Sequence, residues 1–131
     1  MWPILQTMDV VALRPPDTLH RGAIISYRRP DSAHLAHRIV GLPGETVAVQ
    51  DGHVLVGNDH PLHLLDEPYV RSTYMYRSAG PFTLGPDEYL TIGDNRTALT
   101  EQVVHIVSQN DILGVVSSII FPPWRARTLD E

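Results

Sequence analysis

Hydrophobic and polar residues alternate in short runs along the chain, and glycine or proline interrupts most of these runs. Alternation with a period of two is typical of half-buried strands, and no stretch keeps the period of a helix. The clearest strands on this pattern cover residues 8–13, 21–29, 36–40, 45–50, 53–57, 88–92 and 112–121. We therefore predict one all-β domain over residues 1–131, a coiled antiparallel, barrel-like sheet with a β-hairpin extension.

The hairpin is the most specific local prediction. Asp51-Gly52, the dipeptide that type I′ turns favour, separates two alternating runs. A two-residue loop then fixes three cross-strand pairs, which are Gln50 with His53, Val49 with Val54 and Val47 with Val56. The four valines should share one buried face of this hairpin.

Composition and charge exclude several classes of function. Of the 131 residues, 43% are hydrophobic and 19% charged, which is ordinary for a soluble globular domain. The net charge of −5 argues against nucleic-acid binding, which depends on Lys and Arg neutralising phosphates. The absence of cysteine excludes disulfides and thiol chemistry. The longest apolar run, residues 112–121, is shorter than the ~20 residues of a membrane span.

The histidines do not predict a metal site. His60 and His63 lack a third ligand at a recognisable spacing. His34 and His37 lie three residues apart on one predicted strand, so their side chains point to opposite faces. We expect neither a metal nor another cofactor.

Residues 37–47, His-Arg-Ile-Val-Gly-Leu-Pro-Gly-Glu-Thr-Val, are the best candidate for chemistry. A strand ends at a tight elbow that contains Gly41, Pro43 and Gly44, and a second strand follows directly. This places His37 on rigid scaffolding beside the turn, where a catalytic base is useful. Taken alone, His37 fits an ordinary half-buried strand histidine better than a catalytic base.

This stretch closely resembles the segment of type I signal peptidases that carries the general base, Lys-Arg-Val-Ile-Gly-Leu-Pro-Gly-Asp. The chain has His37 and Arg38 where most bacterial members have Lys-Arg, and histidine there is usual in the endoplasmic-reticulum and archaeal branch. Residues 21–30 resemble the strand Arg-Gly-Asp-Ile-Val-Val-Phe-x-x-Pro, and Glu67-Pro68-Tyr69 and residues 112–123 also match. The loop Gly93, Asp94, Asn95 and Arg96 matches the motif Gly-Asp-Asn-Arg without a gap.

The resemblance implies a serine peptidase in which a basic side chain takes the proton of the serine hydroxyl. Met1, Pro3 and Leu5 fall on the pattern Ser-Met-x-Pro-Thr-Leu, so the serine would directly precede Met1 and is absent from this chain, as is a membrane anchor. His37 would be the base, and Asp94 is a candidate to orient it. Leu99 stands where a serine normally supports the base, while Glu101 and Val103 replace aspartate and arginine.

Family members bind an extended signal-peptide segment beside the strand that holds the base. By position, Met1, Pro3, Leu5, Leu35 and Ala36 should line the groove. The expected partners are signal peptides of exported preproteins and, in a full-length protein, the extracytoplasmic membrane surface. A histidine base has a pKa near 6.5 and needs less burial than a lysine to be neutral at pH 7.

Two other functions are compatible with these residues. The first is a relative without catalysis that still binds peptides or a membrane partner. The second is a self-cleaving repressor peptidase, which shares the Ser-Met-x-Pro start and the fold. The elbow at residues 41–45 and the Gly-Asp-Asn-Arg loop argue against the repressor.

Overall fold

A computed structural model describes residues 4–6, 9–29, 34–58, 61–70, 78–96 and 104–129, and its side chains at 34 and 35 are outside this description. Strands dominate these residues, and the helices among them are two short 3₁₀ turns, η2 (Gln109–Asp111) and η3 (Pro123–Arg125). The strands are β1 (Val10–Arg14), β2 (Ile24–Arg28), β3 (His34–Gly41), β4 (Thr46–Gln50), β5 (His53–Gly57), β6 (His63–Leu64), β7 (Ala79–Thr83), β8 (Glu88–Ile92), β9 (Val104–Ser108), β10 (Ile112–Phe121) and β11 (Arg127–Thr128). The predicted all-β class is confirmed.

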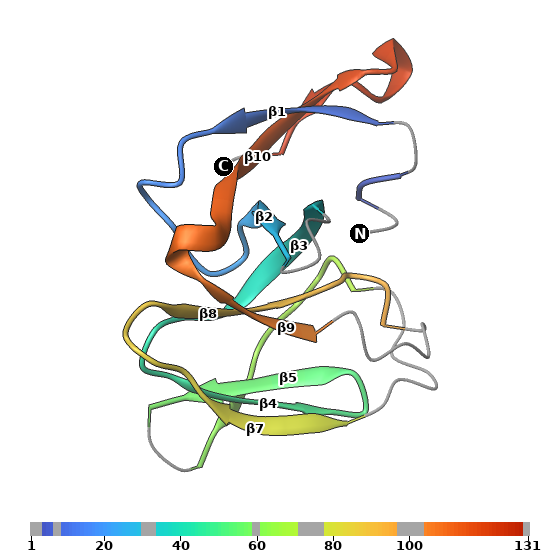
Figure 1. Cartoon of the computed structure of the whole chain (residues 1–131). Coiled ribbons are helices and arrows are strands. Elements are labelled where there is room, and N and C mark those ends of the chain that lie inside the picture. The colour runs from blue at the N-terminus through green and yellow to red at the C-terminus, as the bar shows by residue number, and fades with distance from the viewer. Residues whose placement is uncertain are drawn as a thin grey trace.

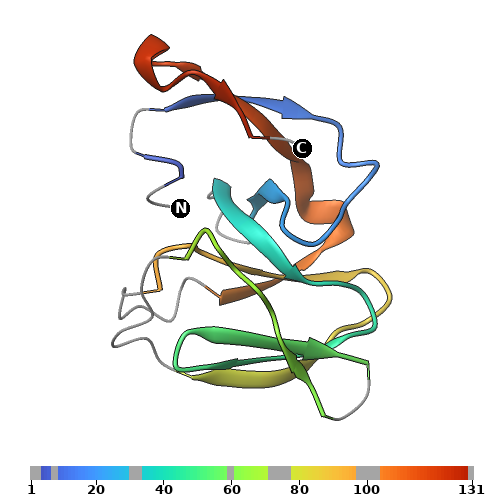
Figure 2. The ribbon, with the colours of Figure 1, turned by 180° about the vertical axis from the view of Figure 1, so that it is seen from behind.

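The strands form two antiparallel sheets. The larger sheet has the order β1-β10-β2-β3-β8-β9, with β11 also paired to β10, and the smaller has the order β6-β5-β4-β7. Figure 1 shows β4, β5 and β7 below β8 and β9, with β1 and β10 at the opposite end of the molecule. Seen from behind, β3 descends from the upper strands to the layer of β8 and β9 (Figure 2). Strand β3 therefore connects the two halves of the fold.

The predicted hairpin is confirmed in its turn and its register. Asp51 and Gly52 both have positive φ values, 52° and 82°, as a type I′ turn requires. The three predicted cross-strand pairs are present between β4 and β5. All four hairpin valines are buried, with at most 4% of their surface exposed.

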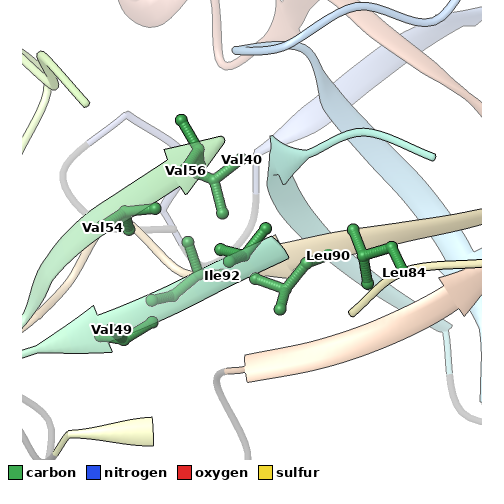
Figure 3. Packing of buried hydrophobic residues seen from close by; sticks show 8 residues of the cluster. Val40, Val49, Val54, Val56, Leu84, Leu90 and Ile92 are labelled. Carbon is green, nitrogen blue, oxygen red and sulfur yellow. The ribbon is translucent and has the colours of Figure 1, made fainter. Parts of the chain in front are cut away.

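The hydrophobic core divides into two clusters, one on each face of the larger sheet. The hairpin valines pack with Val40, Leu84, Leu90 and Ile92 between the two sheets, as Figure 3 shows. Burial of each such aliphatic side chain contributes roughly 1.5–3 kcal/mol of hydrophobic free energy. The second cluster, on the opposite face, contains Ile25, Tyr27, Ile39, Tyr89 and Val107. Successive residues of β3 thus alternate between two cores, which fixes where each side chain of the candidate motif points.

The elbow after β3 depends on its two glycines. Gly44 has a φ of +82°, which glycine adopts without strain. A Cβ atom on Gly41 would lie 2.7 Å from Val47 Cγ2 and 2.9 Å from Leu84 Cδ1. Glu45 stabilises the turn, since its carboxylate accepts hydrogen bonds from the Leu42 N–H at 2.7 Å and from the Arg21 guanidinium at 2.8 and 2.7 Å.

We expect Gly41→Ala to destabilise the fold by about 1–3 kcal/mol, because the added methyl group overpacks a full core. Urea denaturation of the variant and of the unmodified chain measures this change in the free energy of unfolding. Equal unfolding midpoints and slopes for the two proteins would show that the core beside Gly41 accommodates a methyl group without loss of stability.

The sequence pattern missed four strands. Residues 58–81 were expected to be irregular, but β6 and the start of β7 lie there. Strand β7 contains Gly80 and Pro81, which disfavour a central strand but are tolerated here because β7 is an edge strand. Strands β9 and β11 were not predicted either. Among the described residues, no helix is long and apolar enough to cross a membrane.

Candidate active site

His37 lies in the middle of β3 with 8% of its surface exposed. It pairs with Ile25 of β2, and its side chain shares a face with the second core cluster. The Tyr27 hydroxyl is 3.0 Å from His37 Nδ1. The His105 ring, from β9, stacks on the His37 ring with 5.6 Å between centroids and an interplanar angle of 11°. An imidazole on β3 is therefore enclosed by aromatic rings from two other strands.

Thr91 of β8 extends this polar group into the core. Its Oγ1 atom lies 3.5 Å from the Tyr27 hydroxyl and 3.3 Å from the backbone carbonyl oxygen of His105. Thr91 is fully buried, and Tyr27 is only 2% exposed. The side chains of Tyr27, His37, Thr91 and His105 form what we call the histidine cluster.

The environment keeps His37 neutral at physiological pH. Burial, with smaller contributions from the charges of His105 and Arg29, lowers the pKa of His37 from 6.5 to about 4. A neutral imidazole has a lone pair that accepts a proton, as a general base requires.

The low pKa predicts acid sensitivity of the fold. The unfolded chain takes up a proton at His37 near pH 6.5, while the folded chain does so only near pH 4. The free energy of unfolding should therefore be highest above pH 6.5 and fall by ~3 kcal/mol as the pH drops to 4. Urea titrations at pH 7, 6, 5 and 4 measure this loss. His37→Gln should remove much of it, and an unchanged pH dependence in that variant would contradict the assignment.

Asp94 does not orient His37, so that prediction is wrong. Its two carboxylate oxygens accept hydrogen bonds from Arg38 Nε at 2.9 Å and Nη2 at 2.8 Å. Arg38 follows His37 in β3, so its side chain points to the opposite face of the sheet. The contact at His37 Nδ1 comes from Tyr27 instead.

The rest of the Gly-Asp-Asn-Arg loop has a structural role. The fully buried Arg96 donates to the Gly93 and Gly52 carbonyl oxygens at 2.7 and 2.9 Å. It also forms a two-pronged ion pair with Glu67 at 3.0 and 2.7 Å. The Arg38 guanidinium lies 3.7 Å from the centroid of the Tyr69 ring. These contacts tie the loop to the tip of the hairpin and to the Glu-Pro-Tyr segment.

The other predicted site residues are only partly placed. Leu5 and Ala36 are half-buried, as is Asn95 of the loop. Met1, Pro3 and Leu99 lie outside the described residues, as does the side chain of Leu35. The predicted groove is therefore not tested. No group of three metal-ligating side chains occurs in the part of the chain that the structure describes.

Comparison with known proteins establishes the family. The sequence model of the family described as signal peptidase, peptidase S26, matches residues 2–121. The chain belongs to the peptidase S26 family of signal peptidases.

Relatives of this S26 domain include bacterial signal peptidases. The chain is 35% identical over 91 residues to a probable signal peptidase I-2 of Synechocystis, which covers 64% of this chain and 38% of the relative. It is 28% identical over 116 residues to signal peptidase I P of Bacillus subtilis subsp. natto, covering 78% and 59%. The S26 domain thus spans about two fifths to three fifths of these relatives.

A solved structure supports the fold of the S26 domain. A crystal structure of a signal peptidase I from Enterococcus faecalis aligns with a TM-score of 0.60 and 23% identity, over 80% of this chain and 99% of that one. The match agrees with the predicted barrel-like signal-peptidase fold.

Three members of the histidine cluster were missed in the sequence, and Thr91 among them carried no signal beyond its place in the predicted strand 88–92. Tyr27 stands where the family strand quoted above has phenylalanine. The extra hydroxyl group at this position was the sequence feature that could have pointed to a polar contact. No signal pointed to His105, because its strand, β9, was not predicted.

Proposed function

We propose that this S26 domain cleaves signal peptides from exported preproteins, with His37 as the general base and a serine directly before Met1 as the nucleophile. The observation that supports this most is the buried, neutral imidazole of His37 at the base position of the family motif. The domain would act at the extracytoplasmic surface of the cell membrane in a full-length protein.

The reaction would follow the usual course of serine peptidases. The serine oxygen attacks the carbonyl carbon of the scissile peptide bond while its proton moves to Nε2 of His37. The resulting imidazolium gives that proton to the leaving amine, which leaves an ester between the serine and the signal peptide. Water then hydrolyses the ester with His37 again as the base. Asp94 does not take part, since Arg38 holds its carboxylate.

The edge of β3 favours binding of an extended substrate. The ladder between β3 and β8 covers Arg38, Ile39 and Gly41 of β3. Within the described residues, no strand pairs with residues 34–37 on that side, while β2 pairs with them on the other. A substrate strand added there would lie beside His37, with Ala36 and Leu35 next to it, and its backbone hydrogen bonds would supply affinity.

An added serine tests the proposal. We expect the chain with a serine placed before Met1 to cleave a synthetic signal peptide with small residues before the scissile bond. The same chain with alanine at that place, and the chain as printed, should be inactive because an activated hydroxyl is missing. Cleavage is followed by mass spectrometry of the products.

The same experiment also distinguishes a peptidase from a domain that only binds peptides. Binding of the peptide by the serine-extended chain without any cleavage would replace the proposal by a non-catalytic peptide-binding domain. Equal cleavage by the alanine-extended chain would show that the serine is not the nucleophile.

A further inference from the structure

The contact between Tyr27 and His37 has a role that the family motifs do not assign. We propose that Tyr27, with Thr91 behind it, is a positioning residue that fixes the tautomer of His37, so that Nδ1 carries the hydrogen and Nε2 the lone pair. The catalytic value of this tautomer rests on the proposed function, but the tautomer itself is a property of the folded domain.

A backbone carbonyl beside Thr91 favours one direction of the hydrogen bonds. The Thr91 hydroxyl has one hydrogen and two acceptors within reach, the His105 carbonyl oxygen at 3.3 Å and the Tyr27 hydroxyl at 3.5 Å. We assign the hydrogen to the carbonyl oxygen, which is nearer and can only accept. With the Thr91 hydrogen on the carbonyl, the 3.5 Å contact between the two hydroxyl groups leaves Tyr27 as the donor and Thr91 Oγ1 as the acceptor under this assignment. Having used its hydrogen, Tyr27 accepts at 3.0 Å from Nδ1–H of His37. The chain of donors thus runs from His37 through Tyr27 and Thr91 to the carbonyl.

The opposite direction is incompatible with a basic Nε2. If Tyr27 donated to Nδ1, the neutral ring of His37 would carry its hydrogen on Nε2 and could not accept one there. When His37 becomes an imidazolium during the reaction, both ring nitrogens donate, and Nδ1 again needs an acceptor. Tyr27 as acceptor therefore serves both protonation states.

Burial makes this acceptor important. Loss of solvent around His37 opposes the imidazolium, and repulsion from His105 and Arg29 adds to this effect. Among the described residues, no buried side-chain nitrogen or oxygen lacks a hydrogen-bond partner. The Tyr27 oxygen satisfies Nδ1 inside this enclosure, where an unpaired N–H costs about 1–3 kcal/mol.

Nuclear magnetic resonance of ¹⁵N-histidine-labelled protein at pH 7 tests the tautomer directly, without any activity. We expect His37 to show the pattern of the Nδ1–H form, with His37→Gln used to assign its signals. Tyr27→Phe keeps the ring and should shift His37 largely to the Nε2–H form, and Thr91→Val should do so in part. Tyr89→Phe, in the same core cluster, is the matched control and should leave the pattern unchanged.

Two results would overturn the proposal. The first is an Nε2–H pattern in the unmodified protein, and the second is an unchanged Nδ1–H pattern in a folded Tyr27→Phe variant. Thermal unfolding shows whether each variant is folded. An inactive serine-extended chain would refute the proposed function but not the tautomer.

Kinetics of the serine-extended chain provide a second readout. Tyr27→Phe should lower kcat about 10- to 100-fold, by analogy with the loss of a partner that orients a metal-binding histidine. KM should stay within about twofold, because Tyr27 is only 2% exposed and offers a substrate almost no surface. An equal loss in Tyr89→Phe would reduce Tyr27 to a packing residue.

Discussion

Replacing His37 by glutamine in the serine-extended chain should lower kcat/KM by about 10²–10⁴-fold, the contribution of a positioned general base. Glutamine approximates the size of the ring and its amide can still contact Tyr27, but it takes up no proton near neutral pH. Kinetics with a synthetic signal peptide measure the loss. His63→Gln, which changes an exposed histidine on β6, is the matched control and should keep full activity. A His37→Gln enzyme with near-normal turnover would exclude this residue as the base.

The lysine found at this position in other members gives a sharper comparison. His37→Lys should stay weakly active, because the supporting serine is replaced by Leu99 and the amine stays protonated at neutral pH. His37→Lys with Leu99→Ser should be more active than the single variant, with its rate profile shifted to higher pH. Full activity of the single lysine variant would show that Leu99 has no influence on the base.

The largest expected loss of stability follows from removing Arg96. Arg96→Met should lower the free energy of unfolding by about 3–5 kcal/mol, because it leaves the Glu67 carboxylate buried without its cation and two carbonyl oxygens without a donor. Urea denaturation at pH 7 measures the change. Arg28→Met, on an exposed position of β2, should cost less than about 1 kcal/mol.

A double variant distinguishes the loss of stability caused by the unpaired Glu67 charge from the loss caused by poorer packing. Adding Glu67→Gln to Arg96→Met removes the isolated charge and should restore part of the lost stability. If Arg96→Met alone were as stable as the unmodified chain, the Gly-Asp-Asn-Arg loop would not brace the hairpin as described.

The hairpin was predictable because a local rule decides it. Asp51-Gly52 favours one turn type, and a two-residue loop leaves one register for the valines. The position of His37 beside the Gly-Pro-Gly elbow followed in the same way. By contrast, residues 93–103 join β8 to β9, and no short-turn rule fixes a register across a connection of that length. The stacking of His105 on His37 was therefore outside the reach of sequence patterns.

The sequence itself contained a reason to doubt the prediction that Asp94 orients His37. Arg38 and His37 are neighbours in one strand and must point to opposite faces, so a carboxylate that serves one does not serve the other. Which of the two it serves depends on the register between β3 and β8, where Arg38 lies opposite Ile92. That register contains an irregularity between Ile39 and Gly41, which the sequence does not show.

The central claim, that His37 is the base of a serine peptidase, is tested most directly by comparing two pH dependences in the serine-extended chain. One is kcat/KM for a synthetic signal peptide, and the other is the titration of His37 by nuclear magnetic resonance, with circular dichroism to mark the folded range. The acid limb of kcat/KM reports the pKa of the base in the free enzyme. We predict that it coincides with the His37 titration well below 6.5, at about pH 4. An acid limb at a pH where His37 does not titrate would contradict the claim.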